Sequence, residues 1–135
     1  MTLELHATPE EVMRAVEAVQ ELGVLWELSP KEIFGLSLAL EECGSNVVNH
    51  ALKHDPAQTF LVSIQREDDT MIVELRDGGP PFDPTAAPEV PLVADDDLPP
   101  GGWGIPLIRR YLDGIEYRRD GHENVLRLTK RVARP

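Results

Sequence analysis

Two polar side chains in the first half of the chain could carry out acid–base and metal-binding chemistry. Glu42 and Asn46 lie four residues apart in a strongly helical pattern, so they share one helix face, and His50 continues the row. A carboxylate such as that of Glu42 can accept a proton from an attacking hydroxyl group. The amide oxygen of Asn46 is a hard ligand suited to Mg²⁺. Taken alone, the same residues could equally form a solvated helix face.

A second group of residues, Asp77–Asp83, follows directly after a predicted strand and reads DGGPPFD. The Asp77 carboxylate at the strand end could accept a hydrogen bond from an exocyclic amine such as that of adenine. Gly79 would let the backbone approach a flat base closely, because it has no Cβ. The alternative for this segment is an ordinary Asp-Gly turn.

A third group, Gly101–Gly104, reads GGWG and leads into a predicted helix. Glycines at such a position, here Gly102 and Gly104, present backbone N–H groups that can bind phosphate. The alternative is a flexible hinge before a helix. Trp103 lies between the two glycines and is expected to be exposed on a lid or an interface.

The order of the three groups, E-x-x-x-N, then D-x-G-x-x-F, then G-x-G before a helix, resembles the N, G1 and G2 boxes of the histidine-kinase-like ATPase superfamily. Within it the chain is most similar to bacterial anti-sigma factor serine/threonine-protein kinases, from about residue 8 onward. The stretches that carry this resemblance are 38–50, 77–84 and 101–131. A P-loop is absent, since Gly-Lys-Ser/Thr does not occur in the sequence.

The resemblance implies a role for each matching residue. Glu42 matches the catalytic base, and Asn46 matches the Mg²⁺ ligand. Asp77, with Gly79 beside it, matches the carboxylate that recognises adenine. Gly102 and Gly104 match the glycines of the lid and the phosphate site. Such proteins use Mg²⁺ and ATP to phosphorylate a serine on an antagonist (anti-anti-sigma) protein. They bind a sigma factor in the alternative state and are commonly homodimers.

Two features depart from the family pattern. The segment from Asp77 to Ile108 contains six acidic residues and no Lys or Arg, so this predicted lid would repel a triphosphate unless a cation offsets it. Pro106 lies in the first turn of the last helix, where a proline is tolerated. The acidic lid favours a second function, a nucleotide-binding regulatory interaction module without kinase activity. A detached histidine-kinase catalytic domain fits less well, because no paired helix with a phosphoacceptor histidine precedes Glu42.

Helices and β-hairpins alternate along the chain. Thr8 and Glu11 predict a capping box at the start of the first helix, and Gly23 can end it. The predicted fold is α+β, a two-layer α/β sandwich of the Bergerat ATP-binding type. Its mixed, mostly antiparallel sheet would be covered on one face by helices, as a single domain over residues 1–135. The predicted strands are Thr2–His6, Phe60–Arg66, Met71–Arg76, Gly114–Arg119 and Asn124–Arg131. The predicted helices start at Thr8 and Ser29 and span Gly104–Leu112, and a long loop covers 77–102.

Composition narrows the remaining classes of function. The net charge of −11 and the presence of only three lysines argue against a nucleic-acid-binding surface and favour a partner with a basic surface. No signal peptide or membrane span is predicted, so we expect a cytoplasmic protein. Cys43 and Trp26 are expected in the core. His50 and His54 are four apart and could hold a metal, although a packed or surface pair is favoured.

Overall fold

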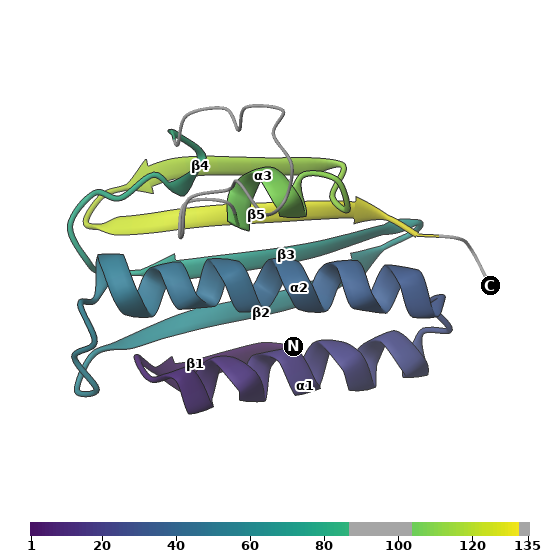
Figure 1. The fold of residues 1–135 in the computed structure, drawn as a ribbon, viewed down its shortest axis with the longest axis horizontal. Helices are drawn as coiled ribbons and strands as arrows, with labels where there is room; N and C mark the ends of the chain where they lie inside the picture. Colours follow the sequence, from purple (N-terminus) through teal and green to yellow (C-terminus); the bar gives the residue numbers. More distant parts are fainter. Residues whose placement is uncertain (87–103, 133–135) are drawn as a thin grey trace, which may run out of the picture.

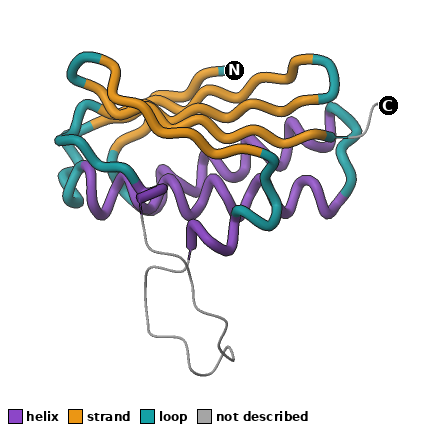
Figure 2. Tube along the Cα trace, turned by 90° about the horizontal axis from the view of Figure 1, so that it is seen from above, coloured by secondary structure: helices purple, strands orange, loops and turns teal. Residues whose placement is uncertain are grey.

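The computed structural model describes residues 1–86 and 104–132, which form two layers. A sheet makes one layer, and α1 (Pro9–Leu25) and α2 (Pro30–Asn46) run antiparallel across one of its faces (Figures 1 and 2). No helix of the described residues lies on the other face of the sheet (Figure 2). The predicted two-layer sandwich is therefore confirmed.

The sheet has five strands in the order β1-β2-β3-β5-β4. Each neighbouring pair of these strands is antiparallel, so the described residues contain no parallel pair of the kind that a mixed sheet would have. Two tight hairpins join β2 to β3 and β4 to β5, the latter through Gly121 with φ of 61°. The predicted strands are confirmed within a residue or two: β1 (Thr2–His6), β2 (Thr59–Glu67), β3 (Thr70–Asp77), β4 (Gly114–Asp120) and β5 (Glu123–Arg131).

The first helix starts as predicted, with Thr8 as its N-cap, but its capping box and its end differ from the prediction. The Thr8 hydroxyl accepts from the Glu11 backbone N–H, but the Glu11 carboxylate accepts from His6 N, so the expected capping box is not complete. Gly23 does not end α1, which continues to Leu25. A Cβ at Gly23 would come within 2.6 Å of the Ile33 side chain, so this glycine lets α2 pack closely against α1.

The second helix begins as predicted and ends in an unusual turn. Ser29 and Glu32 form a full capping box. After Asn46 the chain continues as a π-helix, η1 (Val47–Ala51), in which Leu52 N donates to Val47 O over 2.8 Å. Single π turns inside α-helices occur often at functional sites. This turn overlaps the end of the predicted N box, residues 38–50, and begins directly after Asn46.

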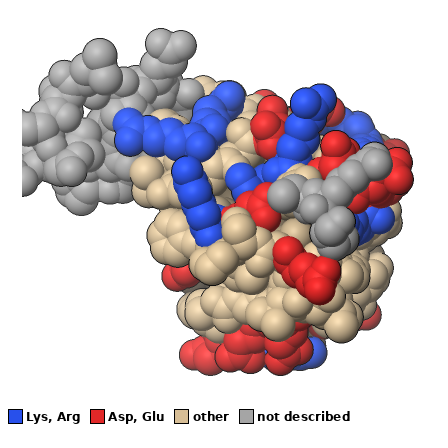
Figure 3. Space-filling view, turned by 90° about the vertical axis from the view of Figure 1, so that its right-hand side faces the viewer, with Lys and Arg blue, Asp and Glu red and all other residues tan. Residues whose placement is uncertain are grey.

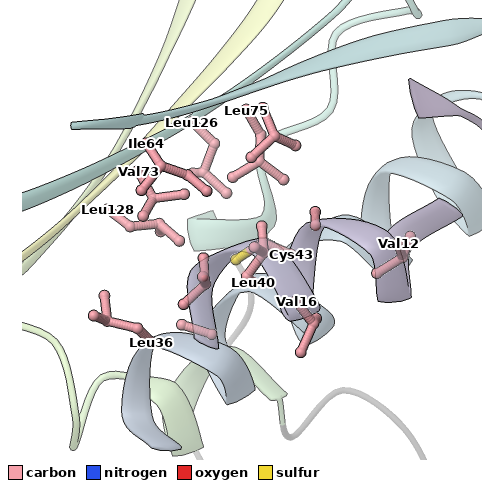
Figure 4. Close-up of a cluster of buried hydrophobic side chains, with 14 of the residues drawn as sticks. Val12, Val16, Leu36, Leu40, Cys43, Ile64, Val73, Leu75, Leu126 and Leu128 are labelled. Carbon is pink, nitrogen blue, oxygen red and sulfur yellow. The ribbon is translucent and has the colours of Figure 1, made fainter. Parts of the chain in front are cut away.

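The core lies between the helices and the sheet (Figure 4). Leu36, Leu40 and Cys43 of α2 point toward Leu75 and the other inward residues of the strands (Figure 4). Burial raises the pKa of the Cys43 thiol, as expected for a small buried hydrophobic side chain. Trp26 packs against this core with part of its surface exposed.

The last helix, α3 (Gly104–Ile108), is shorter than the predicted Gly104–Leu112. Residues 109–111 form turns instead, and Lys130 Nζ donates to Tyr111 O across 2.5 Å. Pro84–Ala86 form a short 3-10 turn, η2, in the predicted loop. Residues 87–103, which include Gly102 and Trp103, lie outside the described residues. None of the helices described here has the length and apolar character needed to cross a membrane.

Candidate functional site

The structure brings Glu42 and Asn46 to one cavity at the C-terminal half of α2. The cavity has a volume of about 340 Å³, and His50 from η1 and Gly104 from α3 also line it. A helix face, a π turn and the start of α3 therefore meet at one place, although about 60 residues of sequence separate α2 from α3. The helix spacing alone predicted that Glu42, Asn46 and His50 lie together.

Glu42 occupies a constrained position in this cavity. It is partly buried, and desolvation, with a smaller contribution from the neighbouring Glu41 carboxylate, raises its pKa; His50 acts in the opposite direction. A Cβ added to Gly104 would overlap the Glu42 carboxyl group, so a larger residue at the start of α3 would displace this side chain. A carboxylate with a raised pKa at the wall of a cavity is a suitable general base.

Asp77 ends β3 and is 4% exposed. It lies on the inner face of the sheet, directly opposite Asn124 of β5. Its Oδ1 accepts two hydrogen bonds of 2.9 Å, one from Gly79 N and one from Asn124 Nδ2. Its Oδ2 accepts none from the described residues. Asp77 lines a second, smaller cavity of about 20 Å³, which is adjacent to the first because Asn46 lines both.

Phe82 and Pro84 also line both cavities. The Phe82 ring stacks on the His50 ring, with 5.3 Å between the ring centroids and an interplanar angle of 21°. The smaller cavity has room for about one water molecule. A purine base would therefore fit at Asp77 only if residues that line this cavity moved.

Gly79 lies beside Asp77, as the motif predicted, and its lack of a Cβ has a clear cause. A Cβ there would come within 2.5 Å of the Ala51 carbonyl oxygen at the end of η1. Glycine at position 79 therefore lets the segment after β3 pack closely against the π turn after α2. Its predicted close approach to a base stays a prediction, as does the role of Gly102, which is outside the described residues.

The sequence interpretation gave no role to Asn124, Tyr117 or Arg119, yet all three contact the loop after Asp77 or one another. Asn124 Oδ1 accepts from Phe82 N at 3.1 Å and from Tyr117 Oη at 2.5 Å. Arg119 Nη1 donates to Gly79 O at 2.8 Å. One signal was available: Asn124 is a polar residue in the alternating, inward-facing pattern that continues with Leu126 and Leu128.

Charge around the site is uneven. Of the described residues that line the larger cavity, Glu42 and Asp83 are acidic and none is Lys or Arg. Eight of the 13 Lys and Arg residues belong to residues 109–135, whereas 20 of the 24 acidic residues precede Arg109. Basic side chains accordingly gather in the upper part of Figure 3, at the height of β4 and β5 in Figure 1. A polyphosphate in the cavity would need a cation to offset the two carboxylates.

The paired histidines do not form a metal site with the groups around them. Among residues 1–86 and 104–132, no three or more His, Cys, Asp or Glu side chains are arranged to hold an ion. His50 instead stacks on Phe82, and both His50 and His54 are exposed, in keeping with the favoured interpretation of a packed or surface pair.

Residues 5–130 match the family model of the histidine kinase-like ATPase domain. The chain therefore belongs to the family of histidine kinase-like ATPase domains, as its three motifs indicated. The site described above, with Glu42 and Asn46 on one helix and Asp77 at a strand end, is built from the residues that the resemblance singled out.

Two curated relatives are protein kinases. The chain is 29% identical to the serine/threonine-protein kinase BtrW of Bordetella bronchiseptica over 133 residues, 98% of this chain and 94% of that protein. It is 32% identical to the serine-protein kinase RsbW of Halalkalibacterium halodurans over 108 residues, 76% of this chain and 65% of that protein. In the second case the match spans slightly less than two thirds of the relative.

Two solved structures share the fold. The RsbU and RsbW domains of a Mycobacterium tuberculosis protein give a TM-score of 0.64 at 15% identity, covering 100% of this chain and 33% of that one. The SiaB-SiaC complex of Pseudomonas aeruginosa gives a TM-score of 0.65 at 14% identity, covering 98% of this chain and 89% of that one. At these identities the likeness concerns the fold.

Proposed function

We propose that this protein is a Mg²⁺-ATP-dependent serine/threonine-protein kinase that acts as an anti-sigma regulatory factor by partner switching. The observation that carries the proposal is the convergence of Glu42, Asn46 and Gly104 on one cavity that adjoins the cavity of Asp77. Two curated relatives that are named as protein kinases support it. Its partners would be an antagonist protein, which supplies the serine, and a sigma factor.

The chemical step needs one base and a bound nucleotide. Glu42 takes the proton from the serine hydroxyl of the antagonist as the serine oxygen forms a bond to the γ-phosphorus of ATP. The bond from that phosphorus to the oxygen bridging the β- and γ-phosphates breaks, and ADP leaves. Because desolvation raises the pKa of Glu42, its carboxylate is a stronger base than an exposed glutamate.

The side chains around the cavity suit Mg²⁺ held together with a nucleotide. Asn46 offers an amide oxygen, and the acidic lining attracts a cation. Mg²⁺ in nucleotide sites is usually held by one or two protein oxygens, with phosphates and water filling the other positions. Asn46 would hold the ion, and the ion would supply charge neutralisation between the phosphates and the acidic wall.

The alternative function, a binding module without kinase activity, is supported by the acidic lining of the larger cavity. Without a basic residue among its described lining, the cavity offers no positively charged side chain to the transferred phosphoryl group. A protein of this kind would hold nucleotide and partner without phosphoryl transfer. The two functions differ in one measurable property, the rate of transfer to a partner that binds.

The experiment compares Glu42→Gln with Glu41→Gln, an exposed carboxylate one position away on the same helix. For each variant we would measure ADP affinity by calorimetry, affinity for candidate antagonist proteins, and transfer of labelled phosphate from ATP. Glu42→Gln should keep both affinities and lose transfer by about a hundredfold or more, the scale of a positioned base. Glu41→Gln should transfer close to the wild-type rate.

Asn46→Ala should in contrast weaken both nucleotide affinity and transfer, because it removes the proposed ligand of the ion. If the wild type binds Mg²⁺-ADP and a partner but transfers no phosphate, the protein is a binding module. If the folded wild type binds no adenine nucleotide, both functions fail. The homodimer that the family resemblance implies can be checked in the same preparations by sedimentation.

A further inference from the structure

A row of polar side chains crosses three strands at the edge of the small cavity. Asp77 of β3, Asn124 of β5 and Arg119 of β4 are direct neighbours in the strand register. Arg119 Nη1 donates to Asn124 Oδ1 at 3.2 Å, and Asn124 Nδ2 donates to Asp77 Oδ1 at 2.9 Å. The buried Asn124 amide thus lies between two charged groups. Its oxygen faces the Arg119 guanidinium group, and its amino group faces the Asp77 carboxylate.

The surroundings determine which way the Asn124 amide points. Its Nδ2 faces two acceptors, Asp77 Oδ1 and, at 2.8 Å, Pro80 O. Its Oδ1 faces two donors that cannot accept, Phe82 N and Arg119 Nη1. The opposite orientation would place like groups against each other on both sides. Of the common side chains of this size, only an amide satisfies all these neighbours, because a carboxylate would face Asp77 and an aliphatic group would leave them unpaired.

This arrangement fixes one oxygen of Asp77 and leaves the other for a ligand. Gly79 N and Asn124 Nδ2 both donate to Oδ1, so the carboxylate cannot rotate without losing two hydrogen bonds. The bond to Phe82 N also anchors a segment that lines both cavities. Asn124 therefore holds both the Asp77 carboxylate and part of the cavity lining.

We propose that Asn124 is a positioning residue that directs Oδ2 of Asp77 at the base of the nucleotide and so selects 6-aminopurines over 6-oxopurines. The inference rests on the nucleotide site proposed above. A carboxylate only accepts hydrogen bonds, so it pairs with the 6-amino group of adenine and opposes the 6-oxo group of hypoxanthine. The site can discriminate strongly between the 6-amino and the 6-oxo group only while the Asp77 carboxylate is held in position.

The test compares two Asn124 variants with a matched control. Asn124→Leu keeps the approximate size of the side chain and removes every hydrogen bond, and Asn124→Ser is the milder change should the leucine variant not fold. Asn49→Leu is the control, since Asn49 is an exposed asparagine on η1 that lines neither cavity. Calorimetry with Mg²⁺-ADP and Mg²⁺-IDP gives the ratio of affinities, and circular dichroism checks that each variant is folded.

The wild type and Asn49→Leu should prefer ADP by the same ratio. In the Asn124 variants this ratio should fall by about tenfold, the scale of one hydrogen bond to a charged group. A purely structural role would lower both affinities by the same factor, and an unchanged ratio in a folded Asn124 variant would overturn the inference while leaving the nucleotide site standing. A folded wild type that binds neither nucleotide would overturn the site itself, and this inference with it.

Discussion

Replacing Asp77 by asparagine tests the reasoning about this site most directly, because it changes one atom of a buried group. The carbonyl oxygen of the new amide can take the place of Oδ1 and keep both donors, Gly79 N and Asn124 Nδ2. The new amino group then takes the place of Oδ2 on the side of the ligand. The variant therefore keeps its internal contacts and reverses the hydrogen-bonding character that a bound base would meet.

The two effects have different sizes. Two hydrogen bonds to a charged acceptor become bonds to a neutral one, which should lower the free energy of unfolding by about 1–2 kcal/mol. Binding of ADP loses a hydrogen bond to a charged group, about 1.5–3 kcal/mol, or roughly ten- to a hundredfold in affinity. The affinity for IDP should fall less or rise, because the new amide can donate to the 6-oxo group.

Calorimetry with Mg²⁺-ADP and Mg²⁺-IDP would measure the affinities, and urea denaturation of the same samples would measure stability. The informative combination is a variant that stays folded, binds ADP much more weakly and loses the preference for ADP. An Asp77→Asn variant that binds ADP as tightly as the wild type would refute the placement of the base at Asp77, whatever its stability.

Three further predictions follow from the same contacts. Gly104→Ala should lower phosphate transfer about as much as Glu42→Gln while leaving the circular dichroism spectrum unchanged, because its Cβ would displace the Glu42 carboxyl group; normal transfer by a folded Gly104→Ala would contradict this. Gly79→Ala should lower the urea unfolding free energy by about 1–3 kcal/mol, since its Cβ would press on the Ala51 carbonyl oxygen, and an unchanged value would argue against that packing. The pKa of Glu42 is raised above 4.5, the value of a free glutamate, so on acidification this carboxylate is protonated at a higher pH. Because the protonated form cannot act as a base, phosphate transfer should begin to fall at a higher pH than it would with a glutamate of ordinary pKa. The pH–rate profile of Glu42→Gln should lack that decline.

Several contacts could not have been predicted because they depend on pairs of distant segments. The register between β3 and β5 places Asn124 opposite Asp77, 47 residues earlier in the chain. A shift of one residue in that register would turn Asn124 to the other face of the sheet. Likewise, the contact of Gly104 with Glu42 depends on how α3 packs on α2. Patterns among neighbouring residues contain no information about either of these two contacts.

The sequence by itself determined the features that depend on neighbours along the chain. The spacing of Glu42 and Asn46 placed them on one helix face, β-branched runs between turn signals located the strands, and Ser29 marked the start of α2. Local rules failed where a tertiary contact competed with them, as at Gly23, which packs against Ile33 instead of ending a helix. Only the tertiary structure decided how the segments meet, because packing and strand register, unlike helix periodicity, arise between parts of the chain that are far apart in sequence.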